Sequence, residues 1–281
     1  MSFLRYPAVW LVVIGAIVGI SCSSGPAAPQ PGTPGYFWAG ANLTYKAGDF
    51  VKTTDNLQRL LTLESEFHAR ARVWDIVVSS GLAQGYAEFA DAYEAGAKMN
   101  RQNPAPFRKE VRELRSQAVT YAVQLTEDIH QFMALTKEDQ VLLAFGYPAG
   151  STAEPPALKR IAGGILVQDS EREQALQAML QRGVLMSVCR VVGTPDDAAK
   201  AQEILKAPEV KVPRDTFLMA AARALDAQTD LFGSNKMDQP NRAKVMLGQA
   251  QEALEGVAES KESKKLKEKI DGALKKLTPK T

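Results

Sequence analysis

The sequence has few of the residues from which disulfide scaffolds, metal centres and nucleic-acid surfaces are built. Of its 281 residues only two are Cys and two are His, which argues against a disulfide framework and a dedicated transition-metal site. The 34 basic and 32 acidic side chains nearly cancel, so no general electrostatic attraction to nucleic acid is expected. The patterns GxxxxGK, GxGxxG, HExxH and CxxC are all absent. We therefore expect no catalytic residues, no metal and no cofactor, and a protein that is not an enzyme.

The first residues of the chain have the pattern of an export signal. Residues 8–20 form an apolar run, shorter than the roughly 20 residues that span a bilayer as a helix but suited to a signal-peptide core. Ser21 and Cys22 follow and resemble the cleavage box of bacterial lipoproteins, although Gly19 stands where that family has Leu or Val. The resemblance implies a signal peptide over residues 1–21 and an acylated Cys22. The alternative is a lone Cys that follows an apolar segment.

A proline-rich stretch comes next. Residues 23–35 hold four Pro, three Gly and no charge, so they cannot bury enough apolar surface to fold. We interpret residues 22–35 as a lipidated Cys with a flexible tether, and residues 36–281 as the folded domain. In the lipoprotein resemblance, Ser23 and Ser24 imply forwarding to the outer membrane. We therefore expect a lipid-anchored protein on the periplasmic face of the outer membrane.

Helical periodicity dominates the remaining sequence. The clearest case is residues 106–133, where apolar side chains recur at steps of three and four and form one stripe. The same reasoning predicts helices over residues 36–47, 50–63, 67–81 and 82–99 (separate or joined), 137–145, 156–167, 170–192, 194–206, 214–232, 241–258 and 261–277. Thr194 is the expected N-cap of its helix. No stretch shows convincing β alternation, so we predict an all-α fold.

The first predicted hairpin carries a further pattern. Its members are Trp38, Ala41, Tyr45, Gly48, Asp49, Phe50, Thr53, Leu57, Leu60 and Leu61. They resemble a tetratricopeptide (TPR) unit, although Thr53 stands where that family prefers Ala and no Pro closes the unit. A weaker similarity to the same TPR pattern covers residues 217–254. The resemblance implies a TPR-like α-solenoid of stacked helix pairs that binds a protein partner.

Within that class, the layout also resembles the T component of TRAP-type transporters. The similar stretch is residues 82–125, which include Phe89 and Ala90. Proteins of that family are periplasmic lipoproteins with TPR-like helix pairs, and they associate with the transporter's substrate-binding partner. The resemblance implies an alternative to the adaptor function, a small-molecule-binding accessory of such a transporter.

The candidate contact residues are aromatic. Tyr86 and Tyr93 belong to an aromatic set that either fills the core or lines a groove for a partner or ligand. Phe145 and Tyr147 lie in an uncharged loop that either contacts a partner or packs beneath a neighbouring helix. Cys189 lies in an apolar run, and we expect a buried thiol there.

The remaining polar features favour structural roles. His68 and His130 are expected on solvated helix faces, with Asp128 on the polar side of its helix, and neither His is assigned a catalytic role. Residues 259–281 hold eight Lys and an apolar stripe. We interpret this segment as a capping helix whose apolar stripe packs on the region of Val245, Leu247 and Leu254. The alternative is contact with anionic lipid or an acidic partner.

Overall fold

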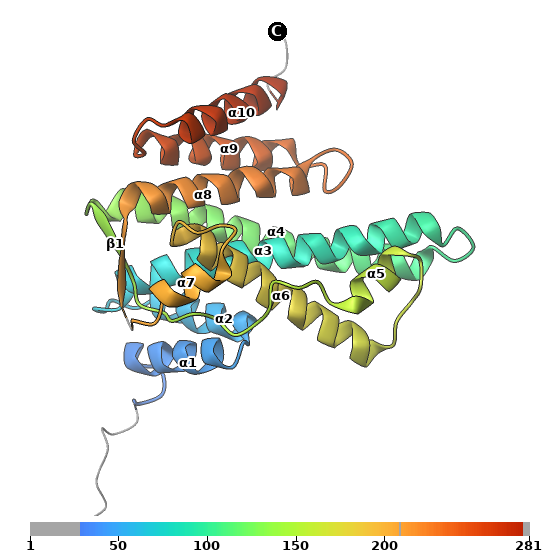
Figure 1. Ribbon diagram of the computed structural model, residues 1–281, viewed down its shortest axis with the longest axis horizontal. Coiled ribbons are helices and arrows are strands. Elements are labelled where there is room, and N and C mark those ends of the chain that lie inside the picture. Colours follow the sequence, from blue (N-terminus) through green and yellow to red (C-terminus); the bar gives the residue numbers. More distant parts are fainter. Residues whose placement is uncertain (1–28, 208, 278–281) are drawn as a thin grey trace, which may run out of the picture.

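Figure 1 shows the computed structural model of the chain, which describes residues 29–207 and 209–277. The expected signal peptide, Cys22 and the first part of the tether lie outside the described residues. Most of the described chain is helical, as the sequence predicts. In chain order the elements are α1 (Pro34–Lys46), α2 (Phe50–Leu61), α3 (His68–Met99), α4 (Ala105–Leu135), β1 (Gln140–Leu143), α5 (Pro156–Ala162), α6 (Asp169–Val191), α7 (Ala198–Ile204), β2 (Val210–Pro213), α8 (Arg214–Gln228), the 3₁₀ helix η1 (Thr229–Phe232), α9 (Pro240–Glu255) and α10 (Lys261–Leu277).

The helices lie in successive layers (Figure 1). The α1–α2 hairpin packs on α3, and α3 forms a long antiparallel pair with α4. α6 crosses α3, while α8, α9 and α10 follow as a stack beyond α4. α3 is therefore the centre of the molecule and is buried along most of its length. Burial on several sides explains why the apolar side chains of α3 are not confined to one stripe.

The turn between α1 and α2 follows from its local sequence. Gly48 has a φ of +74°, a left-handed conformation that Gly adopts at little cost. The side chain of Asp49 then caps α2 by accepting a hydrogen bond of 3.2 Å from a backbone N–H of the first turn. Trp38 of α1 is half-buried, stacked on Phe67 at 5.1 Å and edge-on to Trp74 at 5.3 Å between ring centroids. The predicted hairpin is present, while its membership of a TPR array stays a prediction.

The crossing of α3 and α6 depends on glycine. A Cβ atom on Gly183 would lie 2.1 Å from the carbonyl oxygen of Gly81, and one on Gly81 would lie 2.3 Å from the Cα of Val184. Neither distance is compatible with a side chain, so the two helices touch backbone to backbone. Gly85 extends the contact by one turn, since its Cβ position is 2.8 Å from the Met179 carbonyl oxygen.

The ends of several helices differ from the sequence prediction, and the end of α5 differs most. α5 ends at Ala162 and not at residue 167, because Gly163 follows and Gly164 has a φ of +87°. α3, which the sequence left as one helix or two, runs unbroken from His68 to Met99.

The N-cap predicted at Thr194 is wrong. α7 begins at Ala198, and the carboxylate of Asp197 caps it by accepting a hydrogen bond of 2.9 Å from the Lys200 N–H. The Thr194 hydroxyl is directed instead to the carbonyl of Cys189, at 3.4 Å, near the end of α6. The capping side chain is thus an Asp placed three residues later than the sequence suggests.

The helix predicted over residues 137–145 is also wrong, because Gln140–Leu143 forms strand β1. It pairs antiparallel with β2, with Val141 opposite Val212 and Leu143 opposite Val210. Tertiary pairing with a segment far along the chain overrides the local helical tendency. The two strands lie beside the left-hand ends of α3, α4 and α8 in Figure 1.

The C-terminal helix packs as expected. Ile270 of α10 is fully buried and Leu266 is 9% exposed, against a layer of α9 that includes buried Leu247 and Leu254. Val245, which we also expected beneath α10, is 58% exposed and points elsewhere. Met246 takes its place among the buried residues of α9.

Candidate functional site

The four aromatic side chains proposed from the sequence as contacts lie mainly inside the protein. Tyr86 and Tyr93 are buried along α3, and burial is the main cause that raises the pKa of Tyr93 to about 12. Phe145 is buried against Trp74, with 5.9 Å between ring centroids, as in the packing alternative. Tyr147 is half-buried and is the most accessible of the four. Their contact with a partner or ligand stays a prediction. The thiol of Cys189 is buried, as expected.

A cluster of polar side chains is buried where α2, α3 and α4 meet. Arg72 is 5% exposed, Asp75 0%, Asp128 3% and Thr54 2%. Nη1 of Arg72 lies 2.9 Å from Oδ1 of Asp128, and the Thr54 hydroxyl donates a hydrogen bond to Asp75. Asp128 is therefore not on a solvated face, contrary to the sequence prediction, because Arg72 of α3 and Gln58 of α2 both contact its carboxylate.

Two glutamines complete this cluster. Nε2 of Gln58 donates to Oδ2 of Asp75 at 2.5 Å and lies 3.3 Å from Oδ2 of Asp128, so one amide bridges both carboxylates. Nε2 of Gln124 lies 2.7 Å from Oδ2 of Asp75 and 2.6 Å from the Thr54 hydroxyl. Because buried carboxylates are costly unless hydrogen-bonded, these contacts tie α2 to the α3–α4 pair.

The cluster holds two carboxyl groups against one guanidinium. Burial and the neighbouring Asp75 raise the pKa of Asp128 well above its usual range, and Arg72 opposes them only in part. The raised pKa favours the protonated form of the Asp128 carboxyl group, which reduces the negative charge buried in the cluster. Nη2 of Arg72 also lies 3.0 Å from Nε2 of His68, which is half-buried, whereas His130 is exposed as expected.

A groove of about 470 Å³ lies beside this cluster, and we call it the edge groove. Its walls come from the loop between α2 and α3, the start of α3, the end of α4 and strand β1. The lining residues are Ser65, Glu66, His68, Ala69, Arg70, Arg72, Val73, Phe132, Leu135, Thr136, Glu138, Gln140, Val141 and Leu142. His68 and Arg72 connect the groove to the buried cluster.

One side of β1 offers unpaired main-chain groups to this groove. The Arg214 N–H donates to the Asp139 carbonyl at 2.8 Å, which fixes the hydrogen-bonding phase of the β1–β2 pair. By the alternation of an antiparallel ladder, the N–H and C=O groups of Gln140 and Leu142 then point away from β2. Neither residue makes a further backbone hydrogen bond in the described chain. The groove touches β1 and no residue of β2, so it lies along this outer edge.

The floor of the edge groove is apolar and its rim is charged. Val73, Phe132 and Val141 are buried, while Leu135 is 69% exposed at the end of α4. At the rim, Arg70 pairs with Glu209 at 2.8 Å. Glu66 and Glu138 add negative charge to the lining, so both signs are present.

Other kinds of site are not found in the described part of the chain. Across residues 29–207 and 209–277, no group of three or more His, Cys, Asp or Glu side chains is placed to hold a metal ion. In the same residues, no helix combines the length and apolar character needed to cross a membrane. No protein-family model matches the chain, and no curated protein or solved structure is detectably similar to it. The function is therefore inferred from the geometry of the edge groove.

Proposed function

We propose that this protein is a membrane-anchored adaptor that binds an extended segment of a protein partner in the edge groove. The observation that carries the proposal is the outer edge of β1, where Gln140 and Leu142 direct main-chain donors and acceptors toward an apolar groove. Unpaired strand edges are templates for another strand, and proteins normally cover or charge them. Strand addition at such an edge is a common way to bind peptides.

The groove defines what the bound segment looks like. An added strand pairs with the main chain of Gln140 and Leu142, and every second side chain of it faces the floor. The floor offers Val73, Phe132 and the exposed Leu135, so the segment carries apolar residues at alternate positions. The mixed charges at the rim favour polar residues between them.

The direct test compares two proline variants. Leu142→Pro removes an N–H on the outer edge of β1, whereas Lys211→Pro removes an N–H on the opposite, outer edge of β2, because these residues face each other in the ladder. Leu142→Ala controls for loss of the Leu side chain. Partner capture is measured with a photoreactive amino acid at position 135, and Val245, exposed on α9, gives the control position.

The adaptor proposal expects crosslinks from position 135 to one short segment of one partner. These crosslinks should be lost with Leu142→Pro and kept with Lys211→Pro. If both variants crosslink equally, or if positions 135 and 245 capture the same proteins, strand addition at β1 is wrong.

A second candidate function is binding of a small molecule, as an accessory of a TRAP-type transporter. Arg72 favours it, because this buried side chain lines both the edge groove and a second cleft of about 360 Å³ between α2 and α4. Its Nε atom has no hydrogen-bond partner. A small carboxylate that raises the melting temperature of the wild type, but not of Arg72→Lys, would support this candidate over the adaptor.

The proposed location follows from the sequence pattern before the folded domain. Acylation at Cys22 would hold the domain on the periplasmic face of the outer membrane, with the proline-rich stretch as a tether. No catalytic residue is assigned in this proposal. The partner is a protein near that membrane, and a transporter component is one candidate.

A further inference from the structure

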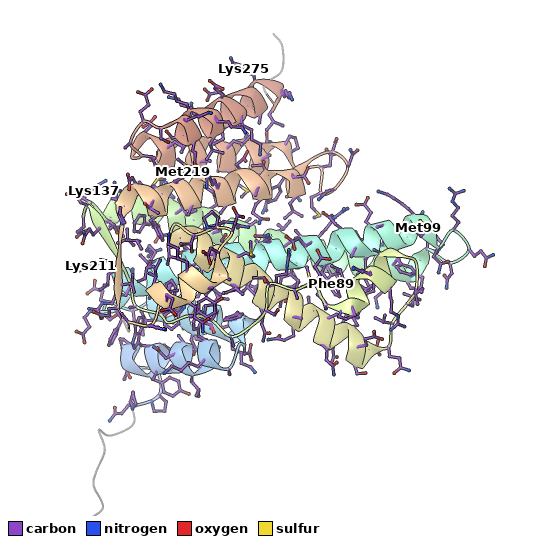
Figure 2. All side chains as sticks on the ribbon, in the orientation of Figure 1. Phe89, Met99, Lys137, Lys211, Met219 and Lys275 are labelled. Carbon is purple, nitrogen blue, oxygen red and sulfur yellow. The ribbon has the colours of Figure 1, made fainter. Side chains whose placement is uncertain are left out.

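The end of the α3–α4 hairpin farthest from the edge groove is exposed and apolar. Met99, the last residue of α3, is 67% exposed, and Ile165 and Leu166 are 51% and 46% exposed. The Asn100 amide donates to the Gly164 carbonyl at 3.0 Å, which holds the loop after α5 against the end of α3. Figure 2 shows Met99 at an end of the molecule that projects beyond the other helices. We call this end, with its three exposed aliphatic side chains, the tip.

The two chain segments that form the tip contain basic residues and no acidic ones. Residues 98–109 contain four basic and no acidic residues, and residues 159–168 contain two basic and no acidic residues. The six are Lys98, Arg101, Arg108, Lys109, Lys159 and Arg160. Three of them pair with acids outside these two segments, Lys98 with Glu94, Lys109 with Glu113 and Arg160 with Glu171. The other three are exposed and form no ion pair with any described residue.

We propose that the tip docks on the anionic surface of a phospholipid bilayer. Exposed aliphatic side chains enter the boundary between headgroups and acyl chains, and Lys or Arg side chains beside them attract anionic headgroups. The tip is the convex end of a long hairpin (Figure 1), a shape that meets a flat surface without a complementary groove. The charge is complementary to anionic lipid because Arg101, Arg108 and Lys159 are exposed and form no ion pair within the described residues.

The tip is independent of the proposed adaptor function. α3 has 32 residues, so the tip lies roughly 45 Å from the edge groove at a rise of about 1.5 Å per residue. A membrane contact at the tip therefore leaves the groove accessible to a partner. The proposed membrane contact at the tip is also separate from acylation at Cys22. Every protein in the test therefore carries Cys22→Ala, which removes the proposed lipid anchor.

The test measures the surroundings of the tip itself. An environment-sensitive fluorophore is attached to Met99→Cys in the full chain, and Val245→Cys, exposed on α9, is the matched control. A local signal is needed because residues 8–20 are apolar in sequence and can hold the whole chain on vesicles. The probes are vesicles of phosphatidylcholine alone, and of phosphatidylcholine with phosphatidylglycerol in equal parts.

The expected result is a blue shift at position 99 with the anionic vesicles only, reversed by high salt. The fluorophore at position 245 should not respond. Arg101→Gln and Arg108→Gln should each weaken the binding about fivefold, the effect of about one surface cation. An equal response at positions 99 and 245, an equal response to neutral vesicles, or no effect of the Gln variants would overturn the proposal. Binding of polyglutamate without any response to vesicles would overturn it in favour of an acidic protein partner.

Discussion

Asp128 is a buried carboxyl group that lies next to a second carboxyl group, Asp75, and to the guanidinium of Arg72. Its sequence position gave no sign of this, because Glu127 and His130 beside it are exposed and suggest a polar face. The difference arises from the neighbouring helices, because Arg72 of α3 and Gln58 of α2 both contact the Asp128 carboxylate. A polar residue on an amphipathic helix is thus buried or solvated according to what packs on that face.

The raised pKa of Asp128 predicts a pH-dependent stability. Folding favours its protonated form, so the stabilisation is fully present below the ordinary Asp pKa of about 3.9 and is lost as pH rises through the raised pKa. The free energy of unfolding should fall by up to ~1.4 kcal/mol per pH unit where one proton is released on unfolding. Asp128→Asn, which cannot ionise, should flatten this dependence in urea melts. Parallel pH dependences of the two proteins would contradict the raised pKa of Asp128.

Among the elements, helices with long periodic patterns were predicted well and short segments poorly. The stripe of α4 was visible because it repeats over 31 residues, and the predicted bounds of α10 match those in the structure. β1 has four residues, Gln140–Leu143, in which only Val141 and Leu143 are fully buried. Four residues are too few for periodicity to distinguish a strand from a helix. The strand that pairs with β1 is also about 70 residues later in the chain, so no local pattern indicates the pairing. The edge groove could not be predicted for the same reason, since β1 forms one of its walls.

The α3–α6 crossing makes a prediction at the scale of two helices. Gly183→Ala should destabilise the fold by about 1–3 kcal/mol, because a Cβ there would lie 2.1 Å from the Gly81 carbonyl oxygen. Gly248→Ala is the matched control in α9, where nothing lies within 4 Å of the Cβ position. That variant should be neutral or stabilising by up to ~1 kcal/mol. Equal melting curves for both variants would mean that the two helices cross at a greater distance.

The packing of α10 makes a second prediction at this scale. Ile270→Ala should lower the free energy of unfolding by about 2–5 kcal/mol, since Ile270 is fully buried between α10 and the α8–α9 pair. Chemical denaturation measures the loss. A change below ~0.5 kcal/mol would indicate that α10 detaches readily, in favour of the alternative in which its lysines contact lipid.

At the scale of the whole molecule, the two proposed contact surfaces and the C-terminal helix lie apart from one another. The edge groove lies where α3 begins and α4 ends, the tip lies at the other end of the hairpin, and α10 closes the stack of helices (Figure 1). This layout suits a protein that holds one partner while it faces a membrane. The signal peptide and lipid anchor are predicted from the sequence alone, because residues 1–28 lie outside the described chain.

The lipid anchor can be tested on the intact protein in a bacterial host. Cys22→Ala should abolish labelling with a radioactive fatty acid and block signal-peptide processing. The reason is that the resemblance to lipoproteins implies acylation of the Cys22 thiol, which this variant lacks. Cys189→Ser is the matched control, since this buried thiol should not affect labelling. If the wild type takes up no label, or if Cys22→Ala is labelled equally, the anchor is wrong.

The central claim is that the outer edge of β1 is open and receives a partner strand. Amide hydrogen exchange of the full chain, resolved by residue, tests it with and without the segment identified by crosslinking from position 135. In the free protein the amides of Gln140 and Leu142 should exchange fast, while those of Val141 and Leu143 are protected by β2. Addition of the segment should slow exchange at positions 140 and 142 and leave Lys211 unchanged. Slow exchange at these two amides in the free protein, or no slowing on binding, would contradict the account.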